Sequence, residues 1–298
     1  MEAERRAGKA VYPRAKRVLE YGVFRPGAPF HERNVELGAP LRIKDTPMRI
    51  HVVTPVTPAP FRSVEDFREF ERDGITVTQG FIDNGPASIE CEFDEAMALP
   101  DTLRKIMEAA QSGADAIVVD CLADPAVKAA RELVSIPVVG PGETSMHWAA
   151  LLAGPFSVVT VLDSVRPMIE NIARLHGLDG KLKSIRVVDI PVLELEADKD
   201  RLYSGLGGEA IKAVREDGAR GIVLGCTGML GCAAAVEETL KRETGAYIPV
   251  LDPVPVAIMQ AISFVRLGNR HSKLTYATPP EKPLVGYNFP NRAKLAAE

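Results

Sequence analysis

Short apolar runs alternate with amphipathic stretches along most of the chain from Arg49 onward. The runs ADAIVVDC at 114–121 and ARGIVLGC at 219–226 are rich in Val and Ile, which is typical of strands buried on both faces. The stretch SVRPMIENIARLHG at 164–177 has the apolar spacing of a helix and ends at a glycine. Strands that alternate with helices in this way predict an α/β fold of mostly parallel sheets flanked by helices.

The second half of the chain repeats the element order of the first. Gly113 aligns with Gly218 and Cys121 aligns with Cys226, and each pair is 105 positions apart. Self-similarity at this period indicates a duplicated α/β lobe. The predicted segments are an N-terminal extension at 1–47, a first lobe at 48–153, a second lobe at 154–253, a helix at about 254–270 that packs back on the first lobe, and an irregular tail at 271–298.

Three local patterns carry their own predictions. The stretch FRSVEDFREFERDG at 61–74 has helical spacing and a terminal glycine, so a helix is expected there. The segment 94–111 is also helical in pattern but contains Pro100, which predicts a kink or a restart at that residue. A further helix is expected within 199–217.

Cys121 and Cys226 stand at the carboxyl ends of equivalent predicted strands. Ligands bind at this edge of open α/β sheets, so two facing lobes would place one thiol on each side of a shared cleft. A helix is expected to begin soon after each cysteine, at about Pro125 and about Leu230, and helix N-termini lower thiol pKa values.

Two opposed thiols suit a two-base racemase. One thiolate removes a proton from a stereocentre, and the other thiol donates a proton to the opposite face. Backbone N–H groups after each cysteine would stabilise an enolate-like oxygen, so no cofactor is expected. Taken singly, Cys121 or Cys226 fits a small buried core residue better than a catalytic one, but two cysteines at equivalent positions of a repeat favour chemistry.

The remaining candidate residues fit structural roles. Cys91 and Cys232 have no equivalent in the repeat, which favours packing. Glu143 and His147 lie one helical turn apart, which fits a helix-start carboxylate and a packed histidine better than a catalytic or metal-binding pair. Four cysteines without CxxC spacing and five scattered histidines give no zinc motif, so we expect reduced thiols and no metal.

Composition and charge narrow the class of protein. The 298 residues are 46% hydrophobic and 26% charged, which indicates a globular chain. The net charge of −4 argues against nucleic acid as a partner and gives no basic face for a membrane. No apolar run approaches the roughly 18 residues of a membrane span. The charged N-terminal stretch has no apolar signal core, so a cytoplasmic location is expected.

Five blocks of sequence resemble the hydantoin racemase branch of the aspartate/glutamate racemase superfamily. They occur in the family's order, and the similarity extends over about 48–270. The blocks are GPASIECEFDEAMALP (85–100), DCLADPAVKAAREL (120–133), PVVGPGETSMHWAA (137–150), FSVVTVL (156–162) and VLGCTGM (223–229).

The resemblance implies two pseudo-symmetric lobes with the active site between them. It also implies Cys121 and Cys226 as an acid/base pair that works without cofactor or metal, a small-molecule substrate and a homo-oligomer. The substrate-binding residues that it suggests are Thr54, Gly85, Leu122, Thr160, Thr227 and Gly228. The threonines fit capping or β-strand preference as well, and Gly85 fits a turn.

The chain departs from the family pattern at two points. Hydantoin racemases commonly have Asn-Pro-Asn after the first strand, where this chain has TPVT at 54–57. The glutamate branch usually has Thr-His after its second cysteine, whereas Thr227 is followed here by Gly228. The missing histidine disfavours an amino acid and favours a neutral cyclic amide. Asp120, just before Cys121, would raise the thiol pKa or orient substrate, or be a surface or structural aspartate.

Three kinds of function remain open on the sequence. The first is a racemase of a 5-substituted hydantoin or of allantoin. The second is a lyase or a cis–trans isomerase on the same scaffold; a decarboxylase of disubstituted malonates needs one cysteine, whereas maleate-type isomerases keep two. The third is a non-catalytic metabolite-binding protein.

Overall fold

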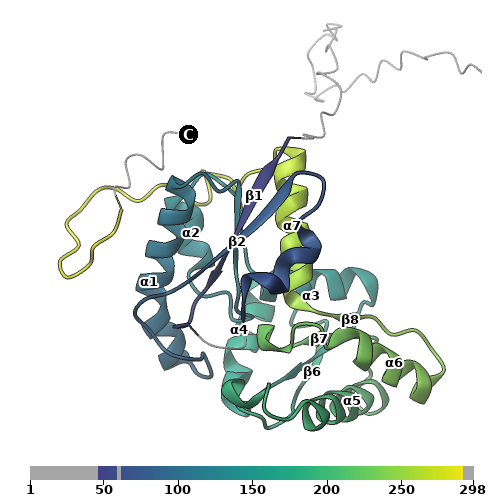
Figure 1. Ribbon diagram of the computed structural model, residues 1–298. Helices are drawn as coiled ribbons and strands as arrows, with labels where there is room; N and C mark the ends of the chain where they lie inside the picture. Colours follow the sequence, from purple (N-terminus) through teal and green to yellow (C-terminus); the bar gives the residue numbers. More distant parts are fainter. Residues whose placement is uncertain (1–45, 59–61, 291–298) are drawn as a thin grey trace, which may run out of the picture. The chain divides into compact units, whose positions relative to one another are not determined.

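The computed structural model describes residues 46–58 and 62–290 (Figure 1). The predicted extension at 1–47 lies outside the described residues except for its last two positions. These ranges hold two four-stranded parallel sheets, of strand order β2-β1-β3-β4 and β6-β5-β7-β8. The predicted α/β fold with mostly parallel sheets is confirmed.

The two sheets repeat one topology, because each orders its strands second, first, third, fourth along the chain. The strands of the first sheet are β1 (Met48–Thr54), β2 (Ile75–Phe81), β3 (Ala116–Val119) and β4 (Val138–Val139). Those of the second are β5 (Phe156–Thr160), β6 (Leu182–Val187), β7 (Gly221–Leu224) and β8 (Val250–Leu251).

An α-helix follows each strand from β2 to β8 along the chain. These helices are α1 (Glu92–Gln111), α2 (Val127–Leu133), α3 (Pro141–Leu152), α4 (Arg166–Leu175), α5 (Lys199–Arg215), α6 (Ala233–Thr244) and α7 (Pro253–Leu267). The expected helix at 199–217 is confirmed as α5. The expected helix at 61–74 is a shorter 3-10 helix, Val64–Phe70. The restart expected at Pro100 does not occur, because α1 runs continuously through that residue.

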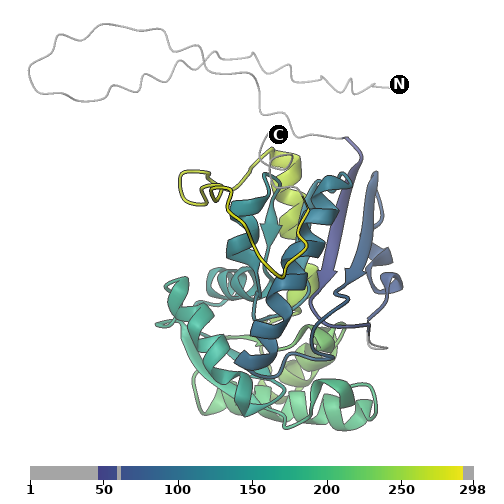
Figure 2. The same ribbon diagram turned by 90° about the vertical axis from the view of Figure 1, so that its left-hand side faces the viewer.

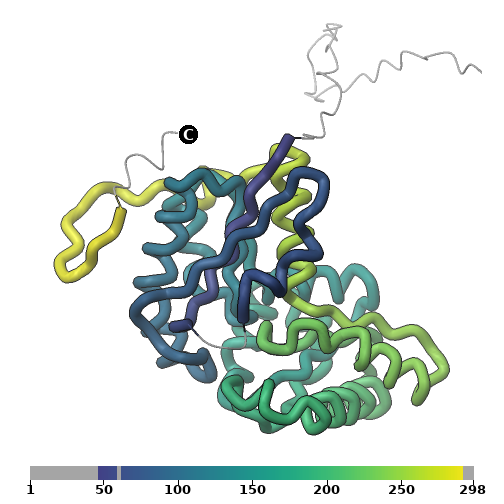
Figure 3. Tube along the Cα trace, in the orientation of Figure 1, coloured from purple at the N-terminus to yellow at the C-terminus, as the bar shows by residue number. Residues whose placement is uncertain are grey.

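Alternation along the strands divides the core of the first sheet between its two faces. Ile50 and Val52 of β1 pack in one cluster with Val254 and Ile258 of α7. Val53, the next residue, packs instead with α1 and α2. Successive side chains of a strand point to opposite faces, so helices cover this sheet on both sides (Figure 1). Figure 3 traces the return of the chain from the second sheet through α7 to the first.

The described part of the C-terminal tail, 271–290, contains no helix or strand and runs beside α1 and α2 (Figure 2). Lys273 donates hydrogen bonds to the carbonyl oxygens of Arg131 and Val134 at 2.8 and 2.9 Å, which fixes the tail to α2. Phe289 packs against the cluster that contains α1. In residues 46–58 and 62–290, no helix combines the length and the apolar character needed to cross a membrane.

Candidate active site

The two repeat-related cysteines follow equivalent strands. Cys121 and Cys226 each lie two residues beyond a strand end, after β3 and β7. Ladder hydrogen bonds continue one residue past each strand, from the amides of Asp120 and Gly225 to β1 and β5 at 2.8 and 2.7 Å. Parallel pairing therefore fixes the backbone immediately before each thiol. Both cysteines are free and half-buried.

The two cysteine loops enclose a cavity of about 40 Å³, which we call the cysteine cavity. Its lining residues are Ile89, Cys121, Leu122, Ala123, Val161, Val165, Met168, Ile169, Gly225, Cys226 and Thr227. Four of the predicted site residues therefore meet here: Cys121, Leu122, Cys226 and Thr227. Most of the other lining side chains are aliphatic, so the two thiols face an apolar space.

Thr54 and Thr160 lie behind the cysteine cavity. Thr54 is 1% exposed, and its hydroxyl donates to the Asp120 carboxylate at 3.2 Å and accepts from the Gln79 amide at 3.0 Å. Thr160 is fully buried, and its hydroxyl donates to the Gly225 carbonyl oxygen at 2.9 Å. Both hydroxyls hold the residue that precedes a cysteine.

Neither predicted glycine lines the cysteine cavity. The backbone N–H of Gly228 donates to Sγ of Cys226 at 3.3 Å, so this residue contacts the thiol directly. Gly85 lines a different cavity, beside α1. A Cβ at Gly85 would lie 2.4 Å from Cδ1 of Ile82, so a larger residue here would require that side chain to shift.

Burial raises the pKa of both cysteine thiols. It raises the pKa of Cys226 to about 11, although the Gly228 N–H and the positive charge of Arg62 act in the opposite direction. It raises the pKa of Cys121 well above its usual value; the Ala123 N–H opposes this shift, and negative charge on Cys226 adds to it. Desolvation of the charged form is the largest cause in both cases.

The expectation that helix N-termini lower both thiol pKa values is therefore wrong. The helix α2 begins only at Val127, six residues after Cys121. Cys226 is followed by a three-residue 3-10 turn, Thr227–Met229, and α6 begins later, at Ala233. The dipole effect acts only within the first turn of a helix, so desolvation outweighs it here.

A buried ion pair contacts both cysteine loops, and no sequence pattern indicated it. The side chains of Arg62 and Asp120 are each 1% exposed, and Arg62 Nε donates to Asp120 at 2.7 Å. Arg62 Nη2 also donates to the carbonyl oxygen of Thr227 at 2.5 Å. Of the roles considered for Asp120, the structure supports a buried, ion-paired aspartate rather than a surface one.

The residues Glu143 and His147 do not form a side-chain pair. The Glu143 carboxylate pairs instead with Arg131 and lies 3.3 Å from Nε2 of His176. His147 Nδ1 contacts the main-chain oxygen of Glu143 at 2.7 Å. In the part of the chain that the structure describes, no three His, Cys, Asp or Glu side chains are grouped so that they could hold a metal ion.

The two unmatched cysteines lie outside the cysteine cavity. Cys91 is the N-cap residue of α1, and its thiol donates to the Asp94 carboxylate at 3.3 Å. Cys232 is 2% exposed and packs in the hydrophobic core.

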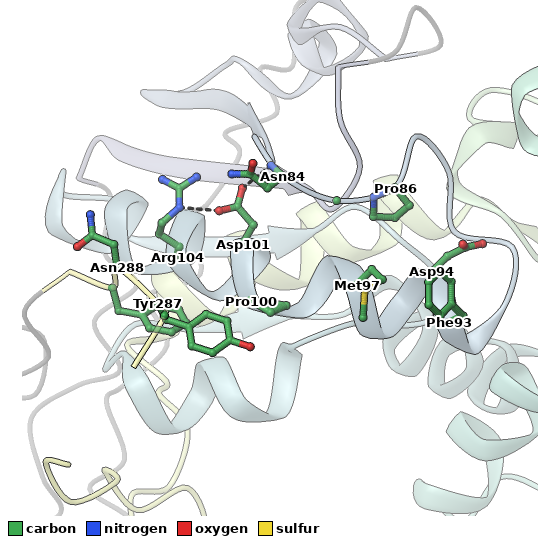
Figure 4. Close-up of a pocket in the computed structure, with 13 residues that line it drawn as sticks. Asn84, Pro86, Phe93, Asp94, Met97, Pro100, Asp101, Arg104, Tyr287 and Asn288 are labelled. Carbon is green, nitrogen blue, oxygen red and sulfur yellow. Dashed lines mark hydrogen bonds and ion pairs between the residues drawn. The ribbon is translucent and has the colours of Figure 1, made fainter. Parts of the chain in front are cut away.

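Two larger cavities differ in their relation to the cysteine cavity. One of about 360 Å³ shares Ala123 and Met168 with the cysteine cavity and is also lined by Glu95 and Asp124. The other, of about 770 Å³, lies between α1 and tail residues 286–289 (Figure 4). The 770 Å³ cavity shares no lining residue with the cysteine cavity, so the chemistry favours the cysteine cavity and its 360 Å³ neighbour.

Each of the two duplicated sheets carries a cysteine loop after its third strand in chain order, and both loops line one cavity. This arrangement defines a two-lobed class of α/β protein. A family model described as Asp/Glu/hydantoin racemase matches residues 65–261. The hydantoin racemase of Pseudomonas sp. (strain NS671) is 39% identical over 203 residues, which are 68% of this chain and 79% of the relative. The hydantoin racemase of Rhizobium meliloti is 35% identical and covers 80% of this chain and 98% of its own.

A solved structure agrees with the sequence comparisons. The allantoin racemase of Pseudomonas fluorescens is 33% identical, with a TM-score of 0.72 over 80% of this chain and all of its own. The chain belongs to the Asp/Glu/hydantoin racemase family. The predicted family membership and the prediction of a racemase-type enzyme are confirmed.

Proposed function

We propose that this protein is a cofactor-independent racemase that inverts the carbon between a ring carbonyl and a ring nitrogen of a 5-substituted hydantoin or of allantoin. Cys121 and Cys226 act as its acid/base pair. The observation that carries the proposal is that both thiols, from equivalent loops of two duplicated halves, line one cavity. The hydantoin and allantoin racemases among its relatives support this substrate class.

The reaction needs only a transfer of protons. The thiolate of one cysteine takes the proton from the ring carbon, and the electron pair left behind delocalises onto the adjacent carbonyl oxygen. The other thiol then donates its proton to the opposite face of that carbon. The thiol and the thiolate have exchanged places at the end, and the total charge is unchanged. A desolvated thiolate with a raised pKa is a strong base, which suits a weakly acidic C–H bond.

The charges near the thiols favour a neutral ring. No Lys or Arg occurs among the residues that line the cysteine cavity. The carboxylates of Glu95 and Asp124 lie close enough to raise the pKa of Cys121. An amino-acid substrate would bring a carboxylate and an ammonium group into this apolar space, where each would need a partner. A cyclic amide carries no such charge.

The substituent of the ring fits the adjoining cavity. Small-molecule pockets usually have about 300–1,000 Å³, so the cysteine cavity alone is too small for a substituted ring. The neighbouring space of about 360 Å³ is in that range and shares Ala123 and Met168 with it. The ring carbon would then lie between the sulfurs, with its substituent directed past Met168.

The test is hydrogen exchange and racemisation with single enantiomers of allantoin and of several 5-substituted hydantoins. In D2O, the wild-type protein should incorporate deuterium at the ring carbon while optical rotation decays. The Cys121→Ser and Cys226→Ser variants should lose racemisation by at least about 100-fold, the usual contribution of a positioned acid or base. Cys91→Ser is the matched control, because Cys91 is half-buried but lies outside the cysteine cavity.

The same panel includes a disubstituted malonate and maleate. Carbon dioxide release or fumarate formation would assign the lyase or the cis–trans isomerase instead. Absence of both exchange and racemisation with every hydantoin would refute the proposed substrate.

A further inference from the structure

The buried guanidinium of Arg62 connects the two cysteine loops. Its Nε and Nη2 donate to the two carboxylate oxygens of Asp120 at 2.7 and 3.3 Å. Its Nη2 also donates to the main-chain oxygen of Thr227. Asp120 directly precedes Cys121, and Thr227 directly follows Cys226. One side chain is thus bonded to the neighbours of both thiols.

We propose that Arg62 is a positioning residue for the cysteine pair: its guanidinium holds the two loops in register and makes Cys226 the first of the two thiols to ionise. This inference rests on the proposed function of the pair in proton transfer.

The geometry of Arg62 is fixed from several sides. Its Nη1 lies 3.6 Å from the Asp66 carboxylate, and its guanidinium lies 5.8 Å from the centre of the Phe67 ring. Both residues belong to the 3-10 helix Val64–Phe70, which begins two residues after Arg62. A planar fork with five donors makes such multiple contacts, whereas the single ammonium of lysine does not reproduce them.

A second hydrogen bond joins the same loops independently. The hydroxyl of Thr227 donates to the main-chain oxygen of Asp120 at 3.2 Å. Thr54 donates to Oδ2 of Asp120, the oxygen that also accepts from Nε of Arg62. The spacing of the two loops is therefore set by a buried polar network, and Arg62 supplies the only cation in the contacts named here.

The charges around the two thiols are not equal. Arg62 is the positive group that acts on Cys226, and its lowering effect on the pKa is larger than the opposing effect of Asp120 or of Glu90 taken singly. The main charges that act on Cys121 are all negative: Cys226, Glu95 and Asp124. Cys226 is consequently the easier of the two to ionise, because an opposite charge nearby favours the charged form.

Ionisation of one thiol also opposes ionisation of the other. Negative charge on Cys226 raises the pKa of Cys121. When Cys226 ionises, Cys121 therefore stays protonated, and the ionised pair is one thiolate facing one thiol, the arrangement from which a two-base racemase acts. The position of Arg62 decides which cysteine carries the charge.

The test measures the alkylation of each cysteine in the full-length protein without substrate. The protein is treated with iodoacetamide over a series of pH values, and the modification of the peptides that contain Cys121 and Cys226 is followed by mass spectrometry. In the wild-type protein we expect Cys226 to react first and Cys121 to follow only at higher pH. Faster reaction of Cys121 in the wild-type protein would overturn the proposal without any variant.

Two variants separate the charge of Arg62 from its geometry. In Arg62→Gln the alkylation profile of Cys226 should move to higher pH by about one unit, which is about a tenfold slower reaction at fixed pH. In Arg62→Lys the profile should stay near that of the wild type, because the charge remains, while kcat falls because the fork is lost. Arg186→Gln is the matched control. Most of the Arg186 side chain is also buried, and its Nε lies 2.7 Å from the Asp217 carboxylate. Neither residue lines the cysteine cavity.

Folding of each variant is checked by circular dichroism and thermal melting. An unchanged Cys226 profile in folded Arg62→Gln would contradict the proposal. A normal alkylation order in a protein that racemises no hydantoin would instead refute the proposed function and leave the charge effect of Arg62 supported.

Discussion

The raised pKa of Cys226 predicts a steep increase of racemase activity with pH. If Cys226 is the base of the resting enzyme, kcat/KM follows its thiolate fraction. With a pKa of about 11, roughly 0.1% of the protein carries that thiolate at about pH 8, and the fraction grows about tenfold per pH unit. We therefore expect the logarithm of kcat/KM to rise with a slope of about one from about pH 7 to about pH 10.

The assay follows the optical rotation of a single enantiomer at subsaturating concentration. Blanks without protein are subtracted at every pH, because base also racemises the substrate, and the ionisation of the substrate itself is measured separately. Asp252, whose pKa burial raises to about 6, titrates below this range. His51, whose pKa burial lowers to about 4, does so as well. Cys91→Ser should keep the wild-type slope.

A plateau of kcat/KM between about pH 7 and about pH 8 would refute the reasoning, because it would require a base with a pKa at or below the ordinary value of a thiol. In that case the Gly228 N–H and Arg62 would lower the pKa of Cys226 by more than desolvation raises it, whereas desolvation is the largest cause in the structure. Thiolate absorbance in the ultraviolet, compared between wild type and Cys226→Ser, distinguishes this result from a rate limited by substrate binding.

Three further predictions concern stability and kinetics. Gly225→Ala should lower the free energy of unfolding by about 1–3 kcal/mol in urea denaturation, because its Cβ would lie 2.4 Å from Cβ of Thr160; Gly180→Ala, with open space around it, should not. Asp252→Ala removes an acceptor that caps α7, at a cost of about 0.5–2 kcal/mol. The pKa of Asp252 is higher in the folded than in the unfolded protein, so its protonation stabilises the fold at low pH, and this stabilisation is lost as the pH rises through about 6. The difference in free energy of unfolding between wild type and Asp252→Ala should therefore be larger at about pH 4 than at about pH 7. For a substrate with one stereocentre, the two enantiomers have equal free energies, so kcat/KM should be equal for both. Any difference in kcat between the enantiomers should be matched by the same factor in KM. Unequal kcat/KM values in initial-rate measurements would contradict a simple racemisation.

The strands and the duplication could be predicted because the physical signals are local. Runs such as ADAIVVDC must be buried on both faces, and the period of 105 residues brings Cys121 and Cys226 to equivalent strand ends. Once the fold is known, the equivalent positions of the two cysteines explain why both thiols line one cavity. Pro100 did not mark a helix boundary. One missing N–H did not interrupt a helix that buries Ile106 and Met107 against the first sheet.

The polar network could not be predicted because its contacts are remote in sequence. Arg62 and Thr227 are 165 positions apart, and no spacing rule connects an arginine after a Pro-rich stretch of sequence with a main-chain oxygen in the other half. The pKa error at the cysteines has a related cause. Helix starts can be read from sequence to within a few residues, but the number of apolar groups around a thiol depends on the packing of both halves.

The difference between the two halves explains why a symmetric scaffold can hold an asymmetric pair of thiols. Thr54 and Thr160 are equivalent, and so are Asp120 and Gly225, which lie 105 positions apart. In the first half the hydroxyl of Thr54 donates to the Asp120 side chain, whereas in the second half Thr160 donates to the Gly225 main chain. A side chain at Gly225 would collide with Thr160, so the second half cannot hold a carboxylate at this position or the cation that would pair with it. The backbone repeat thus presents two sulfurs to one cavity, and the single Arg62–Asp120 pair makes their charges unequal.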